Sequence, residues 1–169
     1  MPPTIRPERP EDLIAVLEVH RQAFQTEAEA RLVHRARWEV SGRISLVACS
    51  REKVVAHILF TPVALDGAPH VKAMGLGPVA VLPSRQGQGL GTALITQGLD
   101  TCRQQGVDAV FVLGHPGYYP RFGFEPATAH GFSYKDETFA PYFFVLPCNP
   151  DLLTTNPGRV RYHRLFDEV

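Results

Sequence analysis

The feature that most constrains the fold is a strand–loop–helix unit in the middle of the chain. Extended residues over 71–82 lead into Gln-Gly-Gln-Gly-Leu-Gly at 86–91, and a helical pattern covers 89–105. Three glycines in five residues let the backbone adopt left-handed angles and approach a bulky anion without Cβ clashes. The start of the helix adds unpaired N–H groups and the positive end of the helix dipole. We therefore expect the loop to bind phosphate groups.

Two common phosphate-binding loops have a different spacing. A Walker loop needs Lys-Ser or Lys-Thr directly after its last glycine, whereas Thr92 follows Gly91 here. A dinucleotide-binding fingerprint needs Gly-x-Gly-x-x-Gly close to the first strand of a βαβ unit, whereas these glycines alternate and three predicted strands precede them. Glycine-rich loops also occur as plain turns, so the glycines alone leave the ligand open.

Hydrophobic periodicity predicts two helices before this unit. The first begins at Pro10, where proline and the acids after it suit a first helical turn. Its expected buried face consists of Leu13, Val16, Leu17, His20 and Phe24. The second helix covers residues 27–38 and ends at Ser41-Gly42. The expected inner side of the helix over 89–105 is Leu90, Ala93, Leu94, Leu99 and Cys102.

The remaining patterns predict strands joined by short turns. The extended segments are 5–6, 44–49, 54–63, 71–82, 109–113, 143–146 and 160–162. Polar turns at 51–53 and 66–67 indicate an antiparallel meander. Residues 109–113 are apolar throughout, as in a strand covered on both faces. Residues 118–122 fit a short turn or helix.

Gly75, Gly77 and Pro78 disturb the strand predicted at 71–82. A proline cannot donate a hydrogen bond to a sheet, so we expect this strand to bulge or to separate from a neighbour near Pro78. The sheet should therefore contain a gap.

The composition is that of an ordinary globular protein. Hydrophobic residues make up 44% and charged residues 20% of 169, which suits one α/β domain over 1–169 with a mixed sheet and a substantial core. Seventeen basic residues balance seventeen acidic ones, so no net positive charge favours nucleic acid or an anionic membrane surface. The longest apolar run is far too short to cross a bilayer.

The cysteines and the start of the chain indicate a reducing environment. Cys49, Cys102 and Cys148 are widely spaced and form neither a disulfide framework nor a CxxC metal pair, so we expect them to pack as small apolar side chains. The first residues lack the apolar stretch of a signal peptide. These features predict a cytoplasmic protein without a bound metal.

Two motifs in a fixed order make the prediction more specific. Val79-Ala80-Val81-Leu82-Pro83 followed by Gln86-x-x-Gly89-x-Gly91 resembles the acetyl-coenzyme A signature of the GNAT-type N-acetyltransferase superfamily, whose loop reads Gln/Arg-x-x-Gly-x-Gly/Ala. Tyr119-x-x-x-Gly123-Phe124 resembles the family's Tyr-x-x-x-Gly-Phe segment. The resemblance covers most of residues 4–126, and the tail matches only loosely.

The resemblance implies a GNAT-like α/β fold and a cofactor. The central sheet would be mixed and mostly antiparallel, with helices on both faces and a splayed strand pair that holds the pantetheine arm of acetyl-CoA. The backbone of Val79, Ala80 and Val81 would pair with that arm, and unpaired groups at the gap are consistent with this. The loop residues that would bind the cofactor are Gln86, Gly87, Gln88, Gly89, Leu90, Gly91 and Thr92.

The resemblance also implies direct transfer of an acetyl group from a thioester to an amine. Tyr119 matches the family's tyrosine that acts as general acid toward the sulfur, and a phenol with a reference pKa of about 10 stays protonated at neutral pH. A tyrosine in an apolar turn is also often a core residue, and the adjacent Tyr118 is a second candidate donor.

The general base stays open. Many relatives place a glutamate on or near the strand that here covers 110–113 and an asparagine just beyond it, whereas this chain continues with Gly114-His115-Pro116. His115 is a candidate base acting through water, or else a structural histidine. His57, inside an apolar strand, is expected to be structural. Glu29, on the second helix, either faces solvent or shapes the amine pocket.

The expected function is N-acetylation of a primary amine, with a small molecule or a peptide as acceptor and no nucleic acid or membrane as partner. Domains of this family often form homodimers through sheet edges or C-terminal strands. The alternative is a non-catalytic acyl-CoA-binding sensor or partner module of the same fold. An unrelated nucleotide-binding domain would instead bind ATP or NAD.

Overall fold

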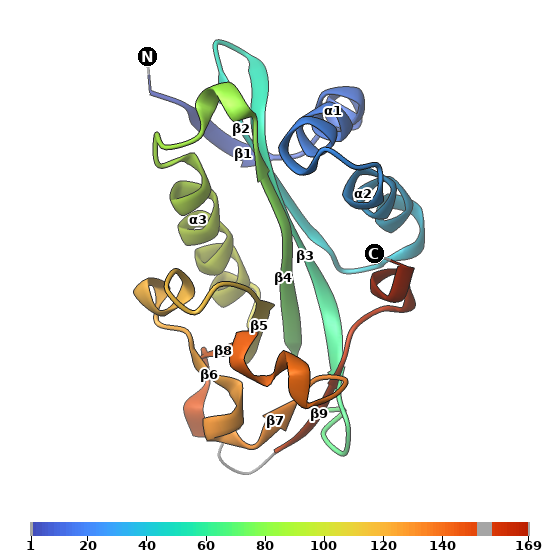
Figure 1. The fold of residues 1–169 in the computed structure, drawn as a ribbon, viewed down its shortest axis with the longest axis vertical. Helices are drawn as coiled ribbons and strands as arrows, with labels where there is room; N and C mark the ends of the chain where they lie inside the picture. Colours follow the sequence, from blue (N-terminus) through green and yellow to red (C-terminus); the bar gives the residue numbers. More distant parts are fainter. Residues whose placement is uncertain (1, 152–156, 169) are drawn as a thin grey trace.

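The computed structural model describes residues 2–151 and 157–168, and a mixed sheet forms its centre (Figure 1). The strands run in the order β1-β2-β3-β4-β5-β8-β6, and β9 pairs with β3 and β7. The pairs β4–β5 and β7–β9 are parallel, and the other pairs are antiparallel. Their bounds are β1 (Thr4–Pro7), β2 (Ile44–Ser50), β3 (Lys53–Leu65), β4 (Ala73–Val81), β5 (Ala109–Leu113), β6 (Glu125–Pro126), β7 (Phe132–Ser133), β8 (Phe143–Pro147) and β9 (Gly158–Arg161).

Helices cover both faces of this sheet, as predicted. In Figure 1, α1 (Leu13–Phe24) and α2 (Ala28–Glu39) lie on one face and α3 (Leu90–Gln104) on the other. Short 3-10 turns complete the chain at η1 (Pro10–Asp12), η2 (Pro83–Arg85), η3 (Tyr119–Phe122), η4 (Ala127–His130), η5 (Glu137–Tyr142) and η6 (Arg164–Glu168). The expected mixed, mostly antiparallel sheet between helical layers is therefore confirmed.

The inner side of α3 agrees with the periodicity except at three residues. Leu90, Leu94, Leu99 and Cys102 are buried as expected. Ala93 is only half-buried, while Ile95 and Gly98 face the sheet. Gly98 is buried because the ring of Phe60 occupies the space of a side chain, and a Cβ there would lie 2.3 Å from that ring.

The prediction that Phe24 belongs to the buried face of α1 is wrong. Its side chain is 38% exposed, because α1 ends there and Gln25 turns the chain away with a left-handed φ of 58°. The Phe24 ring instead stacks on His20, with ring centroids 5.9 Å apart.

The tail extends the sheet beyond the predicted strands. β8 lies where residues 143–146 predicted it, and β9 overlaps the predicted segment 160–162 but begins two residues earlier and ends before Tyr162. β6 and β7 were not predicted, because two residues are too few to show an alternating pattern. β8 pairs along all of β5, so the apolar strand β5 is enclosed by β4 and β8.

The predicted disturbance of β4 lies at Gly77-Pro78. The register between β3 and β4 shifts here, because Ile58 pairs with Val79 while Phe60 pairs with Leu76. β4 pairs with β5 only as far as Leu76 and then continues along β3 alone. The prediction of a bulge and of a gap in the sheet near Pro78 is confirmed.

A chain of buried and half-buried polar side chains lies between the sheet and the helices α1 and α2. His20 Nε2 lies 2.8 Å from His57 Nδ1, and His57 Nε2 lies 2.7 Å from Ser45 Oγ. Ser45 donates to a Glu8 carboxylate oxygen at 2.5 Å, and Arg37 pairs with the same carboxylate. Both histidines are fully buried, as expected of His57. The five side chains connect both helices to the first three strands.

This burial predicts a pH-dependent stability. Burial, together with nearby His57, lowers the pKa of His20 to about 3 from an ordinary value of 6.5. Below pH 6.5 the unfolded chain therefore binds a proton that the folded protein does not. The free energy of unfolding should fall with decreasing pH, by up to about 1.4 kcal/mol per unit.

Urea denaturation between pH 7.5 and 5 measures this slope. His20→Gln should reduce it by about one proton, because the titrating ring is absent. His70→Gln is the matched control, since it removes an exposed histidine and leaves the buried pair intact. Equal slopes for wild type and His20→Gln would contradict the prediction.

Candidate active site

The glycine loop has the backbone geometry that its sequence predicts. Gly87 and Gly89 have φ angles of +76° and +82°, and Gly89 is the residue before the first turn of α3. The first intrahelical bond of α3 joins the Ala93 N–H to the Gly89 carbonyl at 3.0 Å. The backbone N–H groups at the start of α3 have no intrahelical acceptor and can therefore bind an anion.

A cleft of about 270 Å³ opens at this loop. It is lined by Val81, Arg85, Gln86, Gly87, Gly89, Leu90, Gly91, Thr92 and Tyr118. The Gln86 side chain donates to the Val81 carbonyl at 3.1 Å and so ties the loop to the end of β4. Arg85 donates to Ser50 at 3.0 Å. Sequence-predicted cofactor residues therefore share one cleft with Tyr118, which directly precedes the second motif.

The gap in the sheet begins beside this cleft. Residues 79–81 pair with β3 on one side, and residues 77–81 have no strand partner on the β5 side. In such a strand alternate backbone N–H and C=O groups point away from the paired neighbour. The segment with Val79, Ala80 and Val81 therefore presents backbone groups that an extended amide chain can pair with.

Tyr119 is a buried residue, 8% exposed, in the core beneath α3. Its ring packs against the backbone of Gly114 so closely that a Cβ there would lie 2.1 Å from the ring. Among the described residues, its hydroxyl has no hydrogen-bond partner. Burial, with a smaller effect of Tyr118, raises the pKa of Tyr119 to about 12, so its proton is retained at neutral pH.

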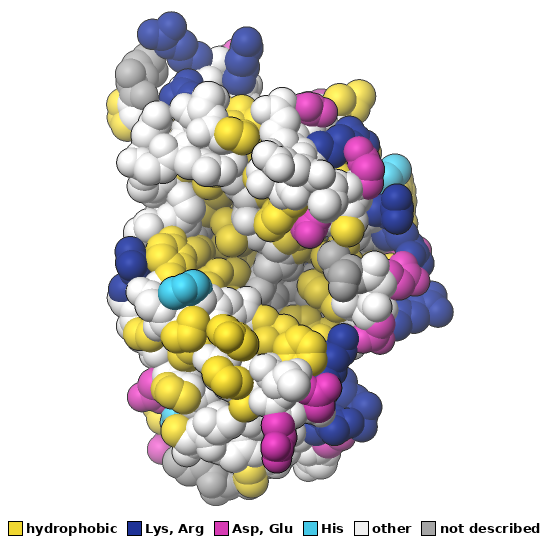
Figure 2. Space-filling view, in the orientation of Figure 1, with side chains coloured by type: hydrophobic (Ala, Val, Ile, Leu, Met, Phe, Trp, Pro, Cys, Tyr) yellow, Lys and Arg dark blue, Asp and Glu magenta, His cyan; other side chains and the backbone are white. Residues whose placement is uncertain are grey.

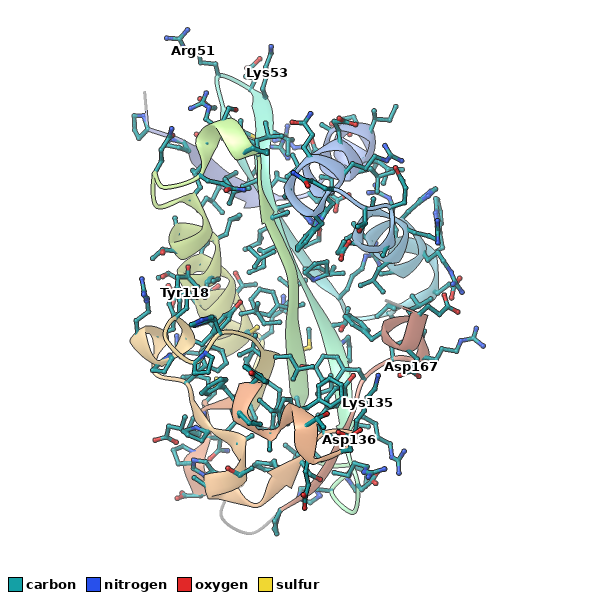
Figure 3. The ribbon with its side chains drawn as sticks, in the orientation of Figure 1. Arg51, Lys53, Tyr118, Lys135, Asp136 and Asp167 are labelled. Atoms are coloured by element: carbon teal, nitrogen blue, oxygen red, sulfur yellow. The ribbon has the colours of Figure 1, made fainter. Side chains whose placement is uncertain are left out.

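Tyr118 occupies a different place from Tyr119. Its hydroxyl lies 3.2 Å from Thr92 Oγ1 at the start of α3, and Figure 3 shows it beside that helix. The Arg121 guanidinium lies 4.4 Å from the centre of the Tyr118 ring. Tyr118 is thus at the phosphate-binding end of the cleft.

The structure does not bring His115 into the site. His115 is exposed, and its Nδ1 accepts the Gly117 N–H at 3.0 Å. It lines neither the cleft at the loop nor the cleft described next.

A second cleft of about 300 Å³ lies on the other face of the sheet, at the gap. Figure 2 shows a central hollow bordered by hydrophobic side chains. The lining residues of the cleft come from α2, β4, β5 and the tail: Glu29, Leu32, Leu76, Gly77, Pro78, Leu113, Tyr134, Lys135, Phe139, Tyr162 and Phe166. Its wall is therefore mainly aromatic and aliphatic, with one carboxylate and one ammonium group.

The charged groups of this second cleft are partly engaged. Glu29 is half-buried and accepts a hydrogen bond from Thr26 at 2.7 Å. Lys135 lies 3.4 Å from Asp167 and 5.4 Å from the Tyr134 ring centre. In Figure 3, Lys135 and Asp167 lie near one another at one side of the molecule. The sequence left open whether Glu29 faces solvent or shapes a pocket, and in the structure Glu29 lines this cleft.

Tyr162 forms the floor of the second cleft. Its ring lies on Gly75, where a Cβ would be 2.4 Å away, and its buried hydroxyl has no partner among the described residues. Burial, with contributions from Tyr134 and Tyr119, raises the pKa of Tyr162. Sequence reasoning missed this residue and the other aromatic lining residues, although aromatic residues recur throughout the tail.

The described residues contain no group of three or more His, Cys, Asp or Glu side chains that could hold a metal ion. Within the same ranges, no helix combines the length and the apolar character needed to cross a membrane.

Comparison with known families agrees with this geometry. Residues 4–127 match the model of the acetyltransferase (GNAT) domain. The chain is 35% identical to the uncharacterized N-acetyltransferase YhbS of Escherichia coli over 164 residues, which cover 96% of this chain and 98% of that protein. It is 43% identical to the uncharacterized N-acetyltransferase YjhQ of Escherichia coli over 118 residues, covering 68% of this chain and 65% of that protein.

Solved structures show the same fold. The crystal structure of Escherichia coli YhbS in complex with CoA superposes with a TM-score of 0.92 at 34% identity, covering 99% of this chain and 93% of that one. A GNAT family acetyltransferase from Brucella melitensis in complex with acetyl-CoA has a TM-score of 0.80 at 36% identity and covers 98% of both chains.

The loop geometry predicts different effects for two similar substitutions. Gly89→Ala should lower the free energy of unfolding by about 1 kcal/mol or more, because alanine is strained at its left-handed φ. Gly91→Ala should change it by less than about 0.5 kcal/mol, because Gly91 is helical and a Cβ there has its nearest neighbours at 3.8 Å and 3.9 Å. Urea denaturation of both variants checks this, and an equal loss in both would contradict it.

Proposed function

This chain belongs to the GNAT family of acetyltransferases, and we propose that it transfers the acetyl group of acetyl-CoA to a primary amine. The observation that carries the proposal is the position of the gap between β4 and β5. One end of the gap adjoins the glycine loop and the other adjoins the aromatic cleft. A phosphate-bearing cofactor and an acceptor can therefore meet there from opposite faces.

The residues of the loop and of β4 fit acetyl-CoA. The N–H groups at the start of α3 and the side chains of Arg85 and Thr92 would hold its phosphates. The free edge of residues 77–81 would pair with the amides of its pantetheine arm. Acetyl-CoA would supply an activated acetyl thioester, and residues of this chain would orient the reactants and donate or accept protons.

Tyr119 is proposed as the general acid. The attack of an amine on a thioester expels a thiolate, which leaves more readily when a proton is delivered to the sulfur. The hydroxyl of Tyr119 has no partner among the described residues, and its pKa of about 12 keeps the proton available at neutral pH. Gly114 leaves space for the Tyr119 ring, because a side chain at position 114 would displace that ring.

The aromatic cleft is proposed as the acceptor site. Tyr134, Phe139, Tyr162 and Phe166 offer an apolar surface, and the Glu29 carboxylate offers a partner for a cationic amine. An amine with an aromatic or aliphatic body fits this wall better than a polyamine, whose further charges would be buried unpaired. Because the tail supplies much of the wall, we propose that residues 1–169 form one acetyltransferase domain.

Replacing Tyr119 by phenylalanine tests the general acid. Tyr119→Phe should lower kcat by about a hundredfold, because general acid catalysis is lost, while CoA affinity measured by calorimetry stays the same. Tyr118→Phe is the matched control and should retain most of kcat, since its hydroxyl contacts Thr92 instead. Unchanged turnover by Tyr119→Phe would refute the assignment. Acetyl-CoA binding without wild-type turnover on any amine would favour the non-catalytic sensor.

An amine panel tests the acceptor site. Arylalkylamines should be acetylated with a higher kcat/KM than spermidine or free lysine. Glu29→Gln should raise KM for the amine by about tenfold and leave KM for acetyl-CoA unchanged, because it removes a charged contact to the acceptor only. Glu27→Gln is the control, as Glu27 pairs with Arg21 outside the cleft. A preference for polyamines, or equal effects of both variants, would contradict this prediction.

A further inference from the structure

The aromatic cleft carries one positive charge, and this charge lies close to its wall. Lys135 lines the cleft, and its ammonium nitrogen lies 5.4 Å from the centre of the Tyr134 ring and 5.9 Å from the centre of the Phe139 ring. Both rings line the same cleft. A cation within about 6 Å of an aromatic ring is attracted by the negative face of that ring. The charged end of Lys135, and not its hydrocarbon stem alone, is therefore beside the cleft.

The backbone around Lys135 is held by hydrogen bonds. Its φ is +51°, a left-handed angle that is uncommon for a residue with a side chain. The Lys135 carbonyl accepts a hydrogen bond from the Arg159 guanidinium at 3.0 Å. The next residue, Asp136, caps the turn η5 by accepting the Thr138 N–H at 2.9 Å. These bonds fix the point from which the lysine side chain extends.

Asp167 leaves Lys135 able to bind a second anion. The two charged groups are 3.4 Å apart, with 41% of the Lys135 side chain and 67% of the Asp167 side chain exposed. An ion pair with this exposure is weak. Asp167 is not among the described lining residues of the cleft, and an ammonium has three donors. Burial would lower the pKa of Lys135, but interactions with Tyr134 and Asp167 raise it overall, so the group is a cation at neutral pH.

A cation in this cleft is unfavourable for an amine without an anionic group. The proposed acceptor enters as its ammonium form with Glu29 as partner, and a second positive charge in the same cleft repels it. An anionic group on the acceptor removes this conflict, because it can pair with Lys135 while the ammonium faces Glu29. The two charged lining residues, one of each sign, thus match a ligand that carries both charges.

The size and lining of the cleft restrict this ligand further. A volume of about 300 Å³ is at the lower end of the range for small-molecule sites. A phosphate group carries up to two negative charges at neutral pH, whereas the described lining residues supply one cation. A carboxylate, with a single charge, is the better match for Lys135. The remaining aromatic and aliphatic wall suits an apolar body.

We propose that the acceptor is a small amino acid with an aromatic or aliphatic side chain, and that Lys135 is a specificity-determining residue that binds its carboxylate. The inference rests on the proposed function. It narrows the acceptor from primary amines in general to amines that also carry a carboxylate.

The carboxylate takes no part in the bonds that change. The amine nitrogen forms a bond to the acetyl carbon, and the C–S bond of the thioester breaks. The ammonium form gives up two protons, of which one ends on the sulfur of CoA and the other in solvent. The product is an N-acetyl amino acid, whose amide nitrogen is uncharged and no longer pairs with Glu29.

Matched acceptors with and without a carboxylate test this inference. The probes are phenylalanine, phenethylamine, which lacks the carboxylate, and phenylalaninamide, which replaces it with a neutral group of similar shape. Lys135→Met should lower kcat/KM for phenylalanine by about tenfold, because a charge-assisted hydrogen bond is lost. It should leave kcat/KM for the other two amines unchanged or raise it, because a like charge is removed. Comparing each amine with itself cancels the differences in basicity.

Asp167→Asn tests the same contact in the opposite direction. It removes an anion that competes for Lys135. The KM for phenylalanine should therefore fall by about two- to threefold, as expected for an exposed ion pair, while the KM for phenethylamine should not fall. A KM for phenylalanine that rises in this variant would contradict the proposal.

Two variants control for charge and for folding. Lys135→Arg keeps the positive charge and should retain most of the activity on phenylalanine. Lys53→Met removes an exposed lysine that Figure 3 places at the opposite end of the molecule from Lys135, Asp136 and Asp167, and it should affect no acceptor selectively. Urea denaturation checks that each variant is folded, and Lys135→Gln replaces Lys135→Met if the latter is not.

The outcomes separate the two proposals. Equal losses with all three amines in Lys135→Met, or equal effects of Lys135→Met and Lys53→Met, would overturn the role of Lys135 and leave the acetyltransferase in place. Wild-type turnover of phenethylamine but not of phenylalanine would overturn it as well. No wild-type turnover on any amine, with or without a carboxylate, would refute the proposed function.

Calorimetry gives a readout that does not require turnover. Phenylalanine should bind to the wild-type protein in the presence of CoA, which has no acetyl group to transfer. Lys135→Met should weaken this binding by about tenfold, and phenethylamine should bind the two proteins equally or bind the variant more tightly. Equal binding of phenylalanine to both proteins would refute the carboxylate contact.

Discussion

The hydrogen bonds between β4 and β5 stop at Leu76, and both clefts depend on this interruption. Beyond it, Gly77 and Pro78 stand against the single residue Leu59 of β3, so β4 carries one extra residue there and then continues along β3 alone. A continuous ladder would satisfy the backbone groups of residues 77–81 and close the sheet between its two faces. The interruption instead leaves an edge inside the sheet, where an extended ligand can pair.

The two faces of this gap differ in chemistry because different elements cover them. On the α3 face, glycines and helix N–H groups create a polar end suited to phosphate, with Tyr118 beside it. On the other face, α2 and the tail enclose an aromatic cleft with Glu29 on its wall. Tyr119 packs in the core under α3, and Tyr162 packs against the hydrophobic cluster on the other face of the sheet.

The polar chain from Glu8 to His20 is a part of the interior that costs desolvation energy. Buried ions are tolerated when each is paired and hydrogen-bonded, and here Arg37, Ser45 and His57 satisfy Glu8. A core built for stability alone would place apolar residues at these positions. Within the described residues, the buried Nδ1 of His20 is left without a hydrogen-bond partner.

The sequence by itself determined the features that depend on local backbone chemistry. The left-handed angles of Gly87 and Gly89, the start of α3 and the disturbance at Pro78 follow from properties of single residues and their neighbours, and two ordered motifs indicated the family. Only the tertiary structure decided which distant side chains meet. His20 and His57 are separated by 37 positions, and the aromatic cleft joins Glu29 to Phe166. These contacts depend on strand register and helix packing. The exposure of His115 and the burial of Tyr119 depend on them too, and no local pattern encodes them.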